Sequence, residues 1–139
     1  MGLVSLPTLA AVPRATVAEE SKLAVADQRT LAEPWAAVEF TFEVEGERVP
    51  GIVIKLPGER WYASSLICTH AKCVMRYFTD VTVARDTFDV AAKNPVLGCP
   101  CHFSVFDVAN GGEVISGPAP NAPLQLTVEA RDGKVFISR

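Results

Sequence analysis

Two short segments of this chain carry residues that can bind a metal: Cys68-Thr69-His70-Ala71-Lys72-Cys73 and Cys99-Pro100-Cys101-His102. Together they hold all four cysteines and both histidines of the protein. Each segment places a histidine two or three residues after a cysteine, so the pair offers two thiolates and two imidazoles. Donors of this kind select zinc, copper or iron–sulfur clusters. The two other cysteines, Cys73 and Cys101, stand at matching places and form a symmetric pair of thiols.

Two simpler interpretations use the same residues. A zinc site also binds two cysteines and two histidines. The common zinc finger, however, takes both cysteines from one arm and both histidines from the other, whereas each segment here supplies one of each. Zinc would also leave Cys73 and Cys101 without a role. Two structural disulfides would account for the even number of cysteines but not for the histidines. Both alternatives stay open on the residues alone.

The two segments resemble the cluster-binding motifs of Rieske iron–sulfur proteins in the form that carries a disulfide, C-T-H-x-x-C and C-P-C-H-x-S. The resemblance covers about residues 36–139 and includes Gly117-Pro118-Ala119-Pro120, which is similar to that family's proline-rich third loop. It implies one [2Fe–2S] cluster per chain. It assigns Cys68 and Cys99 to one iron, His70 and His102 to the other iron, and a disulfide bond to Cys73 and Cys101.

The resemblance also implies the chemistry of the site. Two neutral imidazoles in place of two thiolates raise the charge of the cluster, and clusters of this kind have potentials of about −150 to +300 mV. In the family, an exposed histidine ligand accepts a hydrogen bond from a hydroquinone, so the site takes up an electron and a proton together. We therefore expect His70 and His102, the ligands that couple the electron to a proton, to face solvent or substrate.

Three further residues are expected beside the cluster, and they tune its potential through hydrogen bonds and shielding. Ser104 matches a serine whose hydroxyl bonds a bridging sulfide in the family. Phe106 stands where high-potential members have a tyrosine that bonds a cysteine sulfur, so we expect a lower potential here. Pro118 lies in the third loop, which is expected to be a stiff cover because proline fixes φ.

Other positions depart from the family pattern. Ala71-Lys72 replaces the Leu-Gly that is common in the first motif, where the leucine shields the cluster and touches quinol. Phe103 replaces a common glycine, and the resulting His-Phe-Ser is similar to the Rieske subunits of arsenite oxidases. The Gly-Pro-Ala-Pro loop is more similar to that of quinol–cytochrome c oxidoreductases.

The first functional hypothesis is an electron-transfer subunit of a cytochrome bc-type quinol oxidoreductase, one redox subunit of a hetero-oligomeric complex rather than a complete enzyme. It would take an electron from quinol at cytochrome b and pass it to a c-type cytochrome. The alternatives are the small Rieske subunit of an arsenite-oxidase-like molybdenum enzyme and a stand-alone soluble Rieske carrier. A net charge of −3 makes nucleic acid an unsuitable partner.

The expected location is the extracytoplasmic, periplasmic face of a membrane, because disulfides persist outside the cytoplasm. The chain has no run of 18 apolar residues and hence no complete transmembrane helix of its own. The apolar start 1–12, MGLVSLPTLAAV, has the composition of a membrane anchor or signal remnant, and equally of an ordinary terminus.

A chain of 139 residues fits one domain. We divide it into an N-terminal linker, 1–34, with a short strand near Lys22–Val25, and a Rieske domain, 35–139. Alternating apolar residues predict strands near 38–45, 52–56, 61–67, 105–107, 113–115, 124–128 and 135–137. The expected fold is all-β, a small antiparallel sandwich or barrel with the motifs as loops at one end. Tyr77–Ala92 is interpreted as an inserted hairpin.

Overall fold

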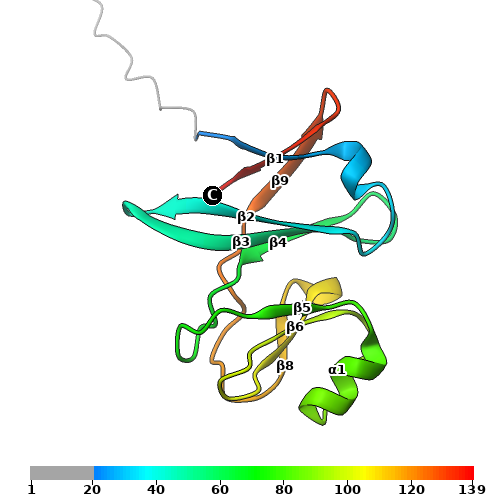
Figure 1. The fold of residues 1–139 in the computed structure, drawn as a ribbon, viewed down its shortest axis with the longest axis vertical. Coiled ribbons are helices and arrows are strands. Elements are labelled where there is room, and N and C mark those ends of the chain that lie inside the picture. Colours follow the sequence, from blue (N-terminus) through cyan, green and yellow to red (C-terminus); the bar gives the residue numbers. More distant parts are fainter. Residues whose placement is uncertain (1–20) are drawn as a thin grey trace, which may run out of the picture.

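The computed structural model of this chain describes residues 21–139, which form three antiparallel sheets (Figure 1). In chain order the elements are β1 (Leu23–Asp27), η1 (Gln28–Leu31), β2 (Ala37–Val44), β3 (Glu47–Lys55), β4 (Trp61–Ser65), β5 (Arg76–Phe78), α1 (Val81–Phe88), β6 (Val96–Gly98), β7 (Val105–Asp107), η2 (Val108–Asn110), β8 (Glu113–Ser116), β9 (Thr127–Arg131) and β10 (Lys134–Ser138). The strand orders are β1-β10-β9, β2-β3-β4 and β5-β6-β7-β8. The predicted all-β class is confirmed.

Two three-stranded sheets form the upper part of the molecule in Figure 1. In β2 the polar residues Glu39, Thr41 and Glu43 are exposed, while the apolar residues between them are buried or half-buried, as the alternation predicted. The β9–β10 hairpin turns at Asp132-Gly133, where it was expected. The core of these sheets contains Leu31, Phe42, Val53, Ala63, Leu126, Val135 and Ile137.

The four-stranded sheet and α1 form the lower part of the molecule in Figure 1. A second core joins this part to the sheets above it. It combines Ile52, Ile54 and Tyr62 from β3 and β4 with Leu97 and Phe106 from β6 and β7. The lower sheet therefore rests on a continuous apolar layer that also reaches the two motifs.

The strand expected near Lys22–Val25 is present as β1. It pairs with β10, so that Leu23 lies opposite Ile137, across almost the whole length of the chain. The apolar start 1–12 lies outside the described residues. No helix within residues 21–139 is long and apolar enough to cross a membrane.

The hairpin expected over Tyr77–Ala92 is wrong, because the helix α1 occupies the middle half of this segment. The carboxylate of Asp80 accepts hydrogen bonds from two backbone N–H groups of the first turn, which caps the helix. Ala84 and Phe88 are four residues apart, so they share one face, and both are buried. Asp89 then adopts a left-handed conformation, φ 49°, and ends the helix.

Tyr77 connects the two parts of the molecule, and its replacement by phenylalanine is expected to destabilise the fold by about 1 kcal/mol. Its hydroxyl donates to the backbone carbonyl of Trp35 at 3.0 Å. Burial raises the pKa of Tyr77 to about 12. Because the folded pKa lies above the unfolded value, the stability linked to the neutral phenol is present below about pH 10 and is lost as the pH rises toward 12.

Urea unfolding at pH 8 and pH 11 checks this prediction. The wild type should lose more stability than Tyr77→Phe over this range. Some loss should remain in the variant, because burial also raises the pKa of Tyr62. Equal pH dependence in the two proteins would contradict the assigned role of Tyr77.

Candidate metal centre

The first motif is a closed loop that follows the buried strand β4. The backbone N–H of Cys68 donates to the carbonyl of Cys73 at 2.8 Å, and the N–H of Lys72 donates to the carbonyl of Cys68 at 3.1 Å. An isolated bridge between Ile67 and Val74 closes the base of the loop. Backbone bonds thus hold the two ends of the loop together.

The second motif follows β6 and has the same backbone plan. The N–H of Cys99 donates to the carbonyl of Ser104 at 2.8 Å, and the N–H of Phe103 donates to the carbonyl of Cys99 at 3.1 Å. The matching spacing of the two motifs therefore corresponds to matching loop geometry.

A disulfide joins the two loops, as the resemblance implied. Cys73 and Cys101 are bonded, with their Cα atoms 6.5 Å apart. The sulfur atoms of these two residues and of Cys99 all lie within 4.8 Å of one another. Because the bonded sulfurs cannot act as thiolate ligands, the disulfide instead forms one wall beside Cys99.

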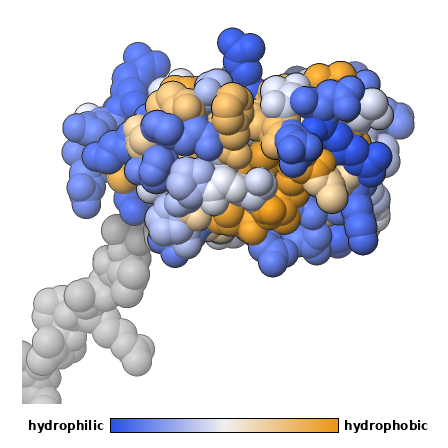
Figure 2. Space-filling model, turned by 90° about the horizontal axis from the view of Figure 1, so that it is seen from below, coloured by the Kyte–Doolittle hydropathy of each residue, from blue (hydrophilic) through white to orange (hydrophobic). Residues whose placement is uncertain are grey.

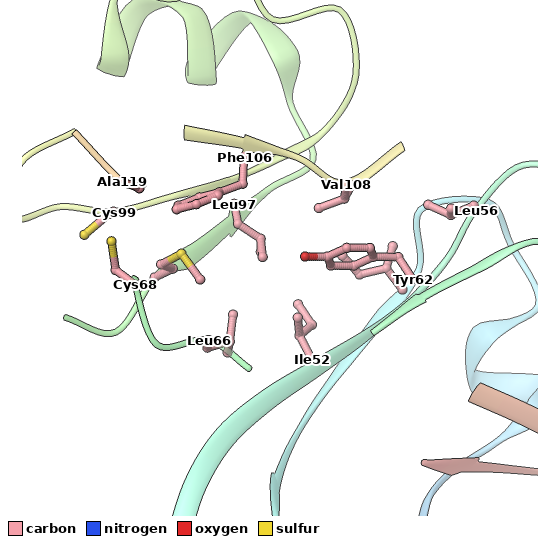
Figure 3. Close-up of a cluster of buried hydrophobic side chains, with 12 residues drawn as sticks. Ile52, Leu56, Tyr62, Leu66, Cys68, Leu97, Cys99, Phe106, Val108 and Ala119 are labelled. Atoms are coloured by element: carbon pink, nitrogen blue, oxygen red, sulfur yellow. The ribbon is translucent and has the colours of Figure 1, made fainter. Parts of the chain in front are cut away.

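Cys68 and Cys99 are free thiols, each only 1% exposed. Their sulfur atoms point toward each other at the edge of the core that joins the two parts of the molecule (Figure 3). Burial raises the pKa of the Cys99 thiol, and the neighbouring Cys68 raises it further, while the backbone amides of Cys101 and His102 lower it. Two buried, adjacent thiolates need a cation between them, because their charges repel.

The two histidines lie on the solvent side of these thiols. His70 and His102 are both exposed, as expected, and their ring centroids are 4.8 Å apart at an interplanar angle of 89°. Two buried thiols and two adjacent imidazoles offer the mixed donor set that a [2Fe–2S] cluster with histidine ligands requires. The residues present therefore fit this cofactor.

The third loop is tied to both ligand loops. The backbone N–H of Ala119 donates to the Ser104 hydroxyl at 3.0 Å, and the Thr69 hydroxyl donates to the carbonyl of Asn121 at 2.7 Å. Since the Ser104 oxygen accepts this bond, its own proton stays free to donate into the site. Gly117 has φ +86°, and a Cβ there would lie 2.4 Å from the Cα of Ser104. Only glycine permits this close approach.

Phe106 and Pro118, the other two residues expected beside the cluster, differ in exposure. Phe106 is fully buried and belongs to the same core as Cys68 and Cys99 (Figure 3). Pro118 is exposed, next to the buried Ala119. Phe106 can therefore shield the thiols as a core aromatic residue, whereas Pro118 forms part of the outer surface of the third loop.

Sequence reasoning missed an aromatic stack beside the second motif. The ring of Phe103 meets Phe88 of α1 edge-on, with centroids 5.9 Å apart, and Phe88 meets Phe78 at 5.2 Å. Phe103 itself is 55% exposed. The signal for a special role was a phenylalanine at a position where glycine is usual, but the sequence did not reveal the partner in α1.

A small antiparallel β domain that presents two buried thiols and two exposed imidazoles on paired loops has the features of a metal-cluster protein with mixed Cys and His donors. The Rieske [2Fe-2S] domain matches residues 21–130, and the chain belongs to that family. It is therefore a Rieske electron-transfer protein with a [2Fe–2S] cofactor.

The chain is similar in sequence to the iron–sulfur subunits of two cytochrome complexes. The chain is 26% identical over 136 residues to the cytochrome b6-f complex iron-sulfur subunit of Chlorobaculum tepidum, covering 98% of this chain and 67% of that protein. It is 39% identical over 70 residues to the cytochrome bc1 complex Rieske iron-sulfur subunit of Streptomyces lividans, covering 50% of this chain and 34% of that protein. The chain thus matches only about a third of the Streptomyces subunit.

Solved structures share the fold. The soluble domain of the Rieske protein II (soxF) from Sulfolobus acidocaldarius matches with a TM-score of 0.62 at 20% identity, covering 88% of this chain and 79% of that one. At this identity the likeness concerns the fold alone.

Proposed function

We propose that this chain is the iron–sulfur subunit of a cytochrome bc-type complex, a quinol–cytochrome c oxidoreductase, with Cys68 and Cys99 on one iron and His70 and His102 on the other. It takes an electron from quinol and passes it to a c-type cytochrome. The names of the two relatives above, both subunits of such complexes, support this proposal. The disulfide supports a position on the extracytoplasmic side of a membrane.

The observation that carries the proposal is the division of the site into a buried half and an exposed half. The thiols of Cys68 and Cys99 are enclosed, whereas both imidazoles reach solvent. When bound, the cluster supplies one-electron chemistry. The outward ring nitrogens of His70 and His102 then form the edge at which a donor such as a quinol can bind and transfer a proton.

The rest of the site keeps water away from the buried half. Leu66, Leu97 and Phe106 pack in the same core as the two free cysteines. The disulfide covers one side of Cys99, and the third loop is fixed to Ser104 and Thr69. Electrons therefore enter and leave through the histidine edge rather than through the core.

The test has two parts. EPR of the dithionite-reduced protein at low temperature, with iron and acid-labile sulfide assays, should show a rhombic signal with average g near 1.9 and about two irons per chain. The tagged chain, purified from membranes of its own source, should bring b- and c-type haem absorption with it. A single zinc and no labile sulfide would exclude the redox function altogether.

A second candidate is the small relay subunit of an arsenite-oxidase-like molybdenum enzyme. Ala71 in place of the quinol-contacting leucine and Phe103 after His102 favour it. Co-purification of molybdenum without b-type haem would select this candidate over the first.

Phe106→Tyr is expected to raise the midpoint potential of the cluster by some tens of millivolts. Phe106 lies in the same core as both thiols, so a phenol here can donate to a cysteine sulfur. A hydrogen bond to a charged acceptor contributes about 1.5–3 kcal/mol. The potential shifts only by the difference in this hydrogen-bond energy between the oxidised and the reduced cluster. A difference of 1.4 kcal/mol corresponds to about 59 mV for one electron.

A redox titration followed by EPR measures this shift. Phe136→Tyr on the distant strand β10 is the matched control and should leave the potential unchanged. An unchanged potential in Phe106→Tyr as well would show that the added hydroxyl does not reach a ligand sulfur.

A further inference from the structure

Three of the four cysteine sulfurs lie close enough together to exchange bonds. The sulfur of Cys99, a proposed iron ligand, and the bonded sulfurs of Cys73 and Cys101 all lie within 4.8 Å of one another. Cys68, the other free thiol, is not part of this group. Thiol–disulfide exchange proceeds from this arrangement, because a free thiolate beside a disulfide can attack one of the two bonded sulfurs.

The two bonded cysteines differ in their surroundings. Cys73 is half-buried and packs against the core that contains Cys68 and Cys99, whereas Cys101 is exposed and lies outside that core. Attack of Cys99 on Cys73 therefore forms the new bond at the core and displaces the thiolate of Cys101, whose charge water can solvate. Attack on Cys101 would instead leave the displaced charge on Cys73, beside apolar side chains.

The backbone of the two loops does not oppose this exchange. The N–H of Cys68 donates to the carbonyl of Cys73, and the N–H of Cys99 donates to the carbonyl of Ser104, both at 2.8 Å. Neither bond involves a sulfur, so both loops keep their shape when the sulfurs change partners. The exchanged disulfide would close a loop only two residues shorter than the present one, whose sequence separation is 28. The chain-entropy contribution is therefore nearly the same for the two pairings.

Loss of the cluster supplies the reactive thiolate. A cysteine binds iron as a thiolate, so it is also released as one. The sulfurs of Cys68 and Cys99 point toward each other (Figure 3), and both residues are only 1% exposed. Two adjacent buried negative charges repel each other. Exchange moves one of these charges to the exposed Cys101 and so relieves the repulsion.

The apolar surroundings make the exchange slow. Leu66, Leu97 and Phe106 pack in the same core as Cys99. The four-stranded sheet that carries the second motif is also apolar on its outside, because hydrophobic surface gathers near the centre of the face seen from below (Figure 2). Limited access lowers the rate of attack by a thiolate. Uncatalysed disulfide rearrangement takes minutes to hours, and we expect a half-time of hours here.

We propose that a chain that loses its cluster exchanges its disulfide. The thiolate of Cys99 attacks the sulfur of Cys73 and is oxidised, while the bond from Cys73 to Cys101 breaks. The electron pair leaves with Cys101, which is reduced and takes a proton from water. Two thiols and one disulfide are present before and after, so no external oxidant or reductant takes part. The new disulfide occupies Cys99 until a thiol reductant breaks it. The disulfide is thus a redox-sensitive switch that controls whether the ligand set is complete.

The test follows the position of the thiols in the full chain. The loaded protein is incubated without oxygen at about pH 8, with and without an iron chelator, and loss of the visible absorption confirms cluster removal. Samples are quenched in acid and then labelled with N-ethylmaleimide in guanidinium at about pH 6, where exchange is slow. Trypsin cuts after Lys72, so Cys68 and Cys73 fall in separate peptides. Fragmentation in the mass spectrometer distinguishes a label on Cys99 from one on Cys101.

The chelated protein should carry two labels per chain throughout the incubation. One label stays on Cys68, and the other should move from Cys99 to Cys101 with a half-time of hours. A disulfide-linked pair of peptides that contains Cys73 and Cys99 should appear at the same rate. The protein without chelator should keep the original disulfide, because its Cys99 is bound to iron.

Two serine variants form a matched pair, because each lacks one proposed ligand and both are expected to be free of cluster. In Cys68→Ser the thiol of Cys99 is present, so the label should appear on Cys101. In Cys99→Ser the remaining thiol is that of Cys68, so the disulfide between Cys73 and Cys101 should persist.

Four results would overturn the exchange. The original disulfide could persist for a day in chelated wild type or in Cys68→Ser. Both labels could disappear into a disulfide between Cys68 and Cys99, which is oxidation and not exchange. The new bond could join Cys99 to Cys101. Equal exchange with and without chelator would show that the bound cluster does not protect Cys99.

Discussion

Cys99→Ser is expected to yield a folded protein that holds no [2Fe–2S] cluster. A serine hydroxyl stays protonated at neutral pH and is a harder donor than a thiolate, so it binds iron of this kind poorly. Cys99 is only 1% exposed, so water has no access to replace the lost ligand. The two side chains are similar in size, and the backbone bond from residue 99 to Ser104 does not involve the sulfur. The fold should therefore survive.

Iron and labile sulfide assays should fall from about two of each per chain to background, and the rhombic EPR signal should disappear. Far-UV circular dichroism should be unchanged. Pro100→Ala, an exposed neighbour in the same loop, is the control and should keep the full cluster content. Retention of two irons in Cys99→Ser would show that the thiol of this residue is not a ligand.

The sequence predicted most of the strands but not how distant ones pair. The alternation in β2 and the Asp132-Gly133 turn are local features, and the structure confirms both. The pairing of β1 was not predicted. Leu23 lies opposite Ile137 of β10, and nothing in residues 22–25 indicates that partner. Such long-range pairing depends on the core between the sheets, which a local pattern does not contain.

The helix α1 was missed because it is short. Eight residues make about two turns, too few for a 3.6-residue period to be distinguished from a loose alternation. The decisive features are the capping bonds of Asp80 and the burial of Phe88 over Gly98. The second of these is a tertiary contact. The capping residue Asp80 was the only local signal, and it also fits a turn, because most of the residues that follow it, Val81, Thr82, Val83 and Thr87 among them, are poor helix formers.

The sequence predicted which residues form the candidate site, but not which side chains pack around it. Residue types and spacing pointed to Cys68, His70, Cys99 and His102, and the structure brings their loops together. The contact of Phe103 with α1 was hidden, because it joins two segments whose proximity depends on the missed helix. The left-handed conformation of Phe103 was hidden as well, since glycine is the residue that normally signals it.

The double variant Cys73→Ser/Cys101→Ser is expected to lower the free energy of unfolding of the cluster-free protein by roughly 3.6 kcal/mol. This is the chain-entropy value for a disulfide that closes a loop of this length, with a sequence separation of 28. Both cysteines must be replaced together. In a single variant the remaining thiol would lie beside Cys99, within 4.8 Å, and could re-form a disulfide with it.

The same variant should lose much less stability when the cluster is bound. The cluster itself joins the loops through Cys68 and Cys99, so it closes almost the same stretch of chain, and the two constraints on the unfolded state are not additive. We expect a loss of about 1 kcal/mol in the loaded protein, together with faster cluster release on warming, because the wall beside Cys99 is gone. Guanidinium unfolding of both forms and the decay of the visible absorption measure these effects. Equal losses in the two forms would mean that the cluster does not bridge the loops, and the assignment of Cys68 and Cys99 as ligands from separate loops would fail with it.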